Sequence, residues 1–136
     1  MAAEQIAKDK DKDLAKLVSK IPLSEIEQVA YWRIKEAAGE DKIVMCQVAF
    51  SSFLKAERNS KEGFAKFATA RQKVADFVIC NKDFSIFAII EIDDSTHNTD
   101  KDSRRDAITG EAGIKTYRYQ ARKLPSVDEM KKEILI

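Results

Sequence analysis

The fold is decided by residues 73–93, which read K-V-A-D-F-V-I-C-N-K-D-F-S-I-F-A-I-I-E-I-D. Two apolar runs, residues 74–80 and 85–92, are rich in strand-forming side chains, and a mainly polar stretch at residues 81–84 separates them. Short apolar runs on either side of such a stretch are typical of a β-hairpin. The sequence therefore predicts two adjacent antiparallel strands.

Each of these strands carries an acidic residue among apolar ones, Asp76 in the first and Glu91 in the second. A hairpin centred between Asp83 and Phe84 places the two acids opposite each other, with their Cβ atoms about 5 Å apart. Like charges at that spacing are destabilising unless a cation lies between them, and without one the pKa of one acid should be raised. Strand alternation also puts Asp93 on the face of Glu91, so that three carboxylates are expected to converge.

A divalent ion bound by Asp76 and Glu91 resolves this conflict, since Mg²⁺ typically takes one or two protein carboxylates and completes its shell with water and phosphate oxygens. The alternative is that Asp76 pairs with Lys73 or Arg71 and that Glu91 lies at an exposed strand end. His97, the single histidine, is either a surface residue of a polar turn or, beside the carboxylates, a general base or phosphate contact.

Glu27 also has two interpretations. Ser24 and Glu27 match the S-x-x-E capping box, in which the glutamate satisfies a backbone N–H at the start of a helix. Glu27 also lies beside the apolar stripe of that helix, from which its side chain can reach a metal cluster at the sheet edge. Spacing alone leaves both interpretations open.

The remaining elements are predicted from hydrophobic periodicity and from turn and capping residues. In chain order, they are a helix over 24–38, a strand over 43–50, one or two short helices on the sheet surface within 51–70, a helix from 98–100 to Gly113, a strand over 114–119 and a C-terminal helix opened by a capping box at 126–129. With the hairpin included, the order is helix-strand-strand-strand-helix-strand, and the last strand should run parallel to an earlier one. This predicts an α/β fold with a mixed four-stranded sheet flanked by helices.

The bulk composition fits one small globular domain. The chain has 136 residues, of which 44% are apolar and 35% charged. We expect a charged tail over residues 1–20, where Lys and Asp alternate at 8–13, and a single domain over residues 21–136. No apolar stretch suits a signal peptide or a membrane span, so a cytoplasmic location without membrane contact is expected. Cys46 and Cys80 form no C-x-x-C pair and are predicted to be core residues.

The net charge of +1 gives no overall sign of nucleic-acid binding, but the charge is uneven. Residues 51–73 hold six basic and two acidic side chains, whereas residues 91–102 hold five acidic and one basic. These segments are either two solvated faces or the basic flank and acidic centre of a cation-dependent phosphodiester site.

Three segments carry a family resemblance: K-V-A-D-F-V-I-C at 73–80, A-I-I-E-I-D-D-S-T-H at 88–97, and R-D at 105–106 followed by A-G-I at 112–114. Together they resemble an uncharacterised bacterial domain family of the PD-(D/E)xK nuclease superfamily, whose core is restriction-endonuclease-like. The resemblance implies a Mg²⁺- or Mn²⁺-dependent nuclease that hydrolyses DNA phosphodiester bonds. The alternatives are a non-catalytic nucleic-acid- or protein-binding module that keeps the fold, and a structural domain whose acids are paired internally.

The resemblance also implies roles for single residues. Asp76, Glu91 and Glu27 are the expected metal ligands. Asp93 stands where the superfamily pattern has a lysine, so the catalytic set is expected to combine Asp93 with Lys73 and His97, which serve the attacking water and the transition state. The expected nucleic-acid contacts are Gln47, Arg71, Arg104, Arg105, Arg122 and Lys123. A partner protein or a second copy is expected to help so small a domain grip DNA.

Overall fold

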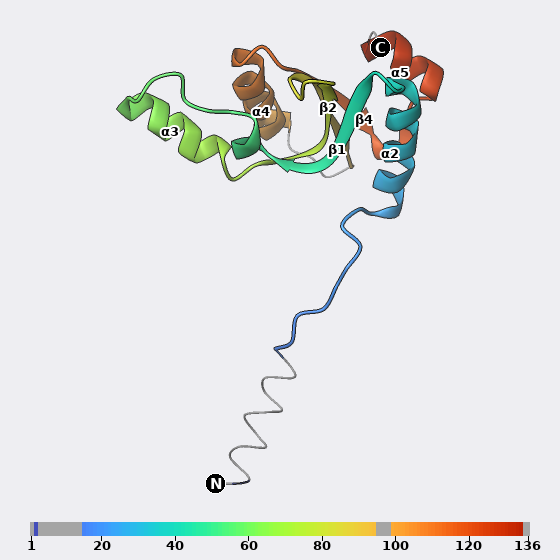
Figure 1. Ribbon diagram of the computed structural model, residues 1–136, viewed down its shortest axis with the longest axis horizontal. Helices are drawn as coiled ribbons and strands as arrows, with labels where there is room; N and C mark the ends of the chain where they lie inside the picture. The colour runs from blue at the N-terminus through green and yellow to red at the C-terminus, as the bar shows by residue number, and fades with distance from the viewer. Residues whose placement is uncertain (1, 3–14, 95–98, 135–136) are drawn as a thin grey trace.

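A β-sheet flanked by helices organises the computed structural model, which describes residue 2, residues 15–94 and residues 99–134 (Figure 1). In chain order, the elements are α2 (Glu25–Ala38), β1 (Lys42–Ala49), η1 (Phe50–Ser52), α3 (Lys61–Ala70), β2 (Val74–Asn81), β3 (Ile86–Asp93), α4 (Thr99–Glu111), β4 (Lys115–Gln120), η2 (Ala121–Lys123) and α5 (Val127–Ile134). The predicted order of helices and strands is confirmed.

The four strands lie side by side in the order β1-β2-β3-β4. Both β1 and β3 run antiparallel to β2, whereas β4 runs parallel to β3. A parallel neighbour requires a crossover connection, which α4 provides between β3 and β4. The fold therefore has the α/β class and the mixed four-stranded sheet that the element order predicted.

Each face of the sheet has its own apolar core. On one face, Ile34 of α2 and Met130 of α5 are buried in a cluster with Phe77 of β2. The two helices lie side by side there (Figure 1). The next residue of β2, Val78, belongs to the second cluster, together with Phe50 of η1. Because successive strand side chains point to opposite faces, β2 is buried on both.

Helix α2 begins and ends where the sequence predicts. The Ser24 hydroxyl accepts a hydrogen bond from the Glu27 N–H at 3.3 Å, and the Glu27 carboxylate accepts one from the Ser24 N–H at 2.9 Å. These reciprocal bonds form the capping box. Gly39 ends the helix with a φ of 71°, a conformation that glycine adopts more readily than other residues.

Strands β2 and β3 pair in the predicted register. Phe77 lies opposite Ile90, and the next two residues of β2 pair with Ile89 and Ala88 in the same register. This is the register of a hairpin centred between Asp83 and Phe84. The register shifts only between Ile79 and Cys80. Because this irregularity lies on the turn side of the regular pairs, it leaves the predicted alignment of the two acids unchanged.

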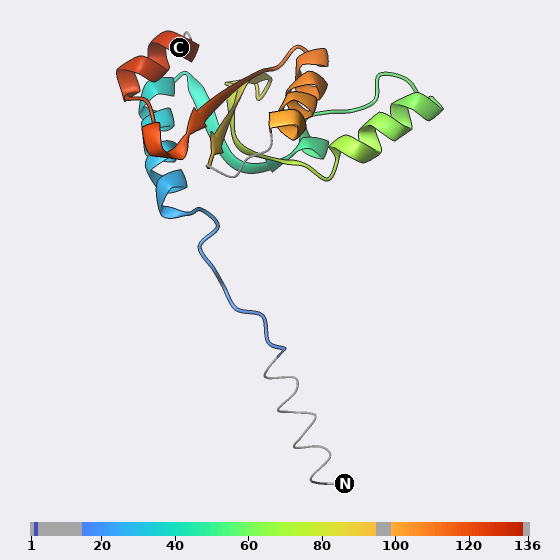
Figure 2. The same ribbon diagram turned by 180° about the vertical axis from the view of Figure 1, so that it is seen from behind.

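The position predicted for the helices of residues 51–70 is wrong for α3. This helix projects beyond α4, at the end of the molecule remote from α2 and α5 (Figures 1 and 2). Within this fully described helix only Ala70 is buried, and Phe64 is 62% exposed. The local spacing of apolar residues indicates a helix but does not determine where that helix docks.

Smaller differences concern β1 and the cysteines. β1 ends at Ala49, one residue earlier than predicted, because Phe50 starts η1 and turns into the core. Cys80 is buried as predicted, Cys46 is only partly buried, and both thiols are free. The predicted charged run at residues 8–13 lies outside the described residues. None of the described helices has the length and apolar character needed to cross a membrane.

Candidate functional site

Asp76 and Glu91 replace the regular backbone pairing at one end of the hairpin. The regular pairing of β2 with β3 ends at Phe77 and Ile90. Just beyond it, the Asp76 carboxylate accepts a hydrogen bond from the Ile92 N–H at 2.8 Å, and the Glu91 carboxylate accepts one from the Asp76 N–H at 3.3 Å. Each acid is therefore held by the backbone of the opposite strand, and the predicted juxtaposition of the two carboxylates is confirmed.

The environment of Glu91 disfavours its charge. Its side chain is buried, with 4% of the residue exposed. Burial, the neighbouring Asp76 charge and hydrogen bonding to Asp76 raise the pKa of Glu91 to about 8, against the opposing effect of Arg105. The predicted raised pKa of one acid is thus confirmed, and the alternative of Glu91 at an exposed strand end is wrong.

Arg105 of α4 supplies a positive charge to this pair of acids. Its Nη2 donates to Glu91 Oε1 at 2.9 Å and to the Val74 carbonyl oxygen at 2.8 Å. The guanidinium also lies over the Phe50 ring, 5.2 Å from its centroid. The sequence predicted Arg105 as a phosphate contact, whereas the structure places it in direct contact with Glu91.

A second arginine, Arg118 of β4, contacts three aspartates. It donates two hydrogen bonds to Asp106, at 2.7 and 3.0 Å, and one to Asp93 at 3.0 Å, and it lies 3.4 Å from Asp102. Burial lowers the pKa of Arg118, but hydrogen bonding to Asp106 and the three aspartate charges outweigh burial and raise it. Sequence reasoning missed this cluster, although Arg118 is the parallel-strand partner of Glu91.

Asp76, Glu91 and Asp93 line one pocket, but Asp93 is paired with Arg118. Asp93 lies near the other acids, but the part of the chain that the structure describes contains no group of three His, Cys, Asp or Glu side chains that could hold a metal ion. The alternation rule placed Asp93 on the correct face without showing that an arginine from β4 occupies the same space.

Five predicted site residues nevertheless line one pocket of about 560 Å³. They are Lys73, Asp76, Glu91, Asp93 and Arg105. The pocket is further lined by Arg118, Lys101 and Asp102. It therefore combines carboxylates with several cationic side chains in one cavity.

Glu27 and Gln47 do not line this pocket, but they contact each other. The Gln47 amide donates to Glu27 Oε2 at 3.3 Å, while Glu27 Oε1 closes the capping box. Gln47 has a φ of 53° and lies between Cys46 and Val48, which pair with the residues flanking Asp76. The capping interpretation of Glu27 is confirmed, and its role as a metal ligand stays a prediction.

The other predicted nucleic-acid contacts lie on the surface, outside the pocket lining. Arg71 and Arg104 are exposed, and the Arg104 Nε donates to the Asp100 carbonyl oxygen. Arg122 and Lys123 are exposed in η2, directly after β4. His97 lies outside the described residues.

Comparison with known families matches residues 18–136 to the family described as "Protein of unknown function (DUF2726)". The chain belongs to this family. The DUF2726 match includes all the helices and strands from α2 to α5, so the family and the candidate site share one domain. This match confirms the predicted membership of an uncharacterised domain family. No curated protein and no solved structure matches the chain.

Proposed function

We propose that this DUF2726 domain is a metal-dependent nuclease of the PD-(D/E)xK superfamily that hydrolyses DNA phosphodiester bonds. The observation that carries the proposal is the pair of opposed carboxylates, Asp76 and Glu91, at a pocket that also presents Lys73, Arg105 and Arg118. Acids bind a catalytic cation, and basic side chains attract phosphate groups.

The donor set fits a hard cation such as Mg²⁺ or Mn²⁺. Both ions accept carboxylate oxygens, and Mg²⁺ needs only one or two protein carboxylates because water and substrate phosphate oxygens complete its shell. Asp76 and Glu91 would hold the ion, and Glu27 beside Gln47 is a further candidate ligand. When bound, such an ion acts as a Lewis acid and lowers the pKa of a bound water.

The chain's own residues supply the remaining chemistry. Lys73, directly before β2, lines the pocket. Its amine would replace the lysine that the superfamily pattern has two residues after the glutamate, where this chain has Asp93. We assign to Lys73 the stabilisation of negative charge that develops on the phosphate. Asp93 is fixed by Arg118 and shapes the pocket wall, and His97 stays the proposed general base.

The test is cleavage of plasmid, duplex and single-stranded DNA in Mn²⁺ and in EDTA. Asp76→Asn and Glu91→Gln should each abolish cleavage, because each removes a metal-binding charge. Asp41→Asn and Glu36→Gln, which neutralise exposed acids away from the pocket, are the matched controls and should cut normally. A folded wild-type protein that cuts no DNA or RNA form in Mn²⁺ would sink the nuclease proposal.

Two observations favour a second candidate, a non-catalytic binding module. Arg105 already forms an ion pair with Glu91 from within the chain, and the described residues offer no three-ligand metal group. Such a module would bind nucleic acid or protein without a metal. Calorimetric titration with Mn²⁺ separates the two candidates: the nuclease binds the ion and Asp76→Asn does not, whereas the module shows no binding in either protein.

A further inference from the structure

The segment of residues 55–73, here called the arm, is poorly covered by the rest of the domain. Its helix, α3, buries only Ala70, and Phe64 in the middle of the helix is 62% exposed. A ten-residue helix is marginal in water on its own, because most helix stability in proteins comes from packing one face against a partner. The arm is therefore short of packing in the isolated chain.

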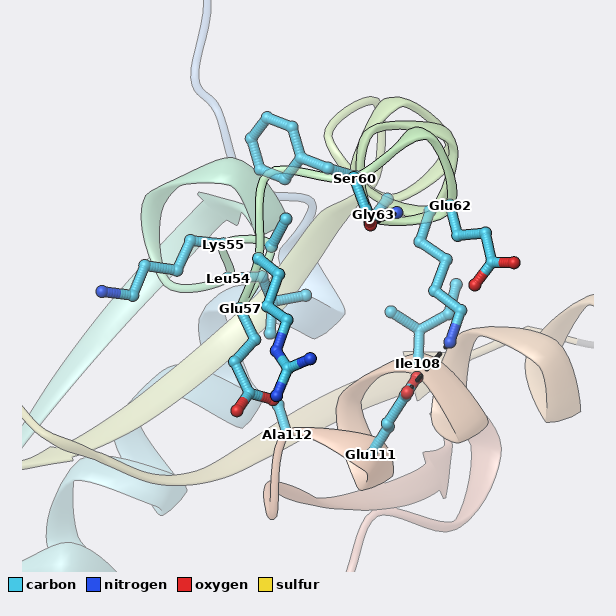
Figure 3. Close-up of a pocket in the computed structure, with 14 residues that line it drawn as sticks. Leu54, Lys55, Glu57, Ser60, Glu62, Gly63, Ile108, Glu111 and Ala112 are labelled. Atoms are coloured by element: carbon cyan, nitrogen blue, oxygen red, sulfur yellow. Dashed lines mark hydrogen bonds and ion pairs between the residues drawn. The ribbon is translucent and has the colours of Figure 1, made fainter.

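A pocket of about 370 Å³ separates the arm from α4 (Figure 3). Phe67 of the arm and Ile108 of α4 lie on its two sides. Across it, Lys66 Nζ pairs with Glu111 Oε1 at 3.0 Å, as the dashed line in Figure 3 shows, but both side chains are about two-thirds exposed. Exposed ion pairs contribute about 0–1 kcal/mol. This contact holds the arm only weakly and leaves its outer side uncovered.

The arm carries a concentrated positive charge. It holds six basic and two acidic side chains, a net of +4, whereas the whole chain carries only +1. The basic residues are Lys55, Arg58, Lys61, Lys66, Arg71 and Lys73. The first five of these are exposed. A dense array of exposed positive charge is complementary to a nucleic-acid backbone, which in duplex DNA carries one negative charge per ~1.7 Å of axis.

The arm also leads directly into the pocket of Asp76 and Glu91. After α3 ends at Ala70, Gln72 and Lys73 line that pocket. A ten-residue helix is about 15 Å long, so α3 extends the basic surface over roughly four base pairs beyond the pocket. A nucleic-acid backbone bound along α3 would therefore continue into the pocket that Asp76 and Glu91 line.

We propose that the arm binds the phosphodiester backbone of the nucleic acid whose cleavage site enters the Asp76–Glu91 pocket. This inference rests on the proposed function for the identity of the substrate, but binding by the arm is measurable without cleavage. The charge of the arm favours nucleic acid over a protein partner as the molecule that covers α3.

The experiment uses the full chain in EDTA with a labelled DNA duplex and the corresponding single strand, titrated over a range of salt concentrations. The arm variant is Lys55→Gln/Arg58→Gln/Lys61→Gln. The matched control, Lys35→Gln/Lys131→Gln/Lys132→Gln, removes three exposed positive charges at the opposite end of the molecule, on α2 and α5 (Figure 1). Circular dichroism of both variants checks that they fold.

The arm variant should bind at least tenfold more weakly than wild type, and its log–log salt slope should fall by about 2 to 3, since each lost phosphate contact removes about 0.7 to 0.9 from the slope. Lys55→Arg/Lys61→Arg, which keeps the charge, should bind like wild type. The strand form that shows the larger loss identifies which backbone the arm holds. Equal affinity of the arm and control variants for DNA overturns the inference. Wild-type protein that binds neither the duplex nor the single strand also overturns it, because a protein partner would then be the molecule that covers the arm.

These outcomes are separate from those of the nuclease test. If wild-type protein binds DNA through the arm but cuts none in Mn²⁺, the proposed function fails and the inference stands. If wild-type protein cuts DNA and the arm and control variants bind and cut it equally well, the inference fails and the proposed function stands.

Discussion

At the scale of single residues, Glu91 controls how the metal-free domain responds to pH. Burial, followed by the charge of Asp76, raises its pKa to about 8 from an ordinary value of 4.5. Between these two values the folded chain binds more protons than the unfolded chain. The stability that protonated Glu91 provides is therefore complete below the unfolded pKa and is lost as the pH rises through about 8.

We predict that Glu91→Gln removes this pH dependence. In EDTA, wild-type protein should lose on the order of 5 kcal/mol of unfolding free energy between acidic pH and a pH above 8, relative to the variant, because the glutamine cannot ionise. Urea midpoints across that range measure the difference. Glu36→Gln, at an exposed position on α2, should follow the wild-type curve. Parallel curves for wild type and Glu91→Gln would contradict the prediction.

Arg105 and its neighbour Arg104 offer a matched pair on α4. Arg105 bonds the buried Glu91 and the Val74 carbonyl, whereas Arg104 is exposed and donates to the Asp100 carbonyl oxygen. Arg105→Met should cost about 2 to 3 kcal/mol above pH 8, since it leaves a buried carboxylate without its cation. Arg104→Met should change the urea midpoint by less than about 0.5 kcal/mol. Equal effects would show that the Glu91 contact does not stabilise the domain.

At the scale of elements, Arg118 joins β4 to α4 and to the end of β3. Its bonds to Asp106 and Asp93 cross-link three elements through a side chain that is 19% exposed. Arg118→Met should destabilise the domain by about 2 kcal/mol, because it removes the positive charge that these partly buried aspartates share. It should also speed amide exchange in α4 more than in α2. The control Arg122→Met, at an exposed position of η2, should leave amide exchange in both helices unchanged. Unchanged exchange in Arg118→Met as well would show that the Arg118 contacts do not stabilise the domain.

The elements that the sequence predicted correctly are those determined by neighbouring residues. Ser24 and Glu27 cap α2 through bonds three residues apart, and the hairpin register follows from its short turn. The opposition of Asp76 and Glu91 follows from that register alone. The pairing of Glu91 with Arg105 was not predictable, because it depends on how α4 docks against the sheet.

The same limit explains α3 and Asp93. The apolar residues of α3 indicate a helix, but its position beyond α4 depends on contacts between distant segments. Asp93 was placed on the correct face by alternation, yet its partner Arg118 comes from a strand 25 residues later. A single sequence contains no local signal for the register of a parallel crossover pair.

At the scale of the whole molecule, a bound metal should stabilise the fold, because the two carboxylates are brought together only when β2 and β3 are paired. Mn²⁺ at about 100 times its Kd should add about 2.7 kcal/mol to the free energy of unfolding, provided that the unfolded chain does not bind it. The gain should grow as the pH rises towards 8, since the ion and the proton compete for Glu91. Urea unfolding of wild type and Asp76→Asn, with Mn²⁺ and with EDTA, measures the gain. Asp41→Asn should respond to Mn²⁺ like wild type. An equal rise in stability in Asp76→Asn would place the bound ion elsewhere on the domain, because Asp76 is one of the two carboxylates proposed to couple Mn²⁺ binding to the pairing of β2 and β3.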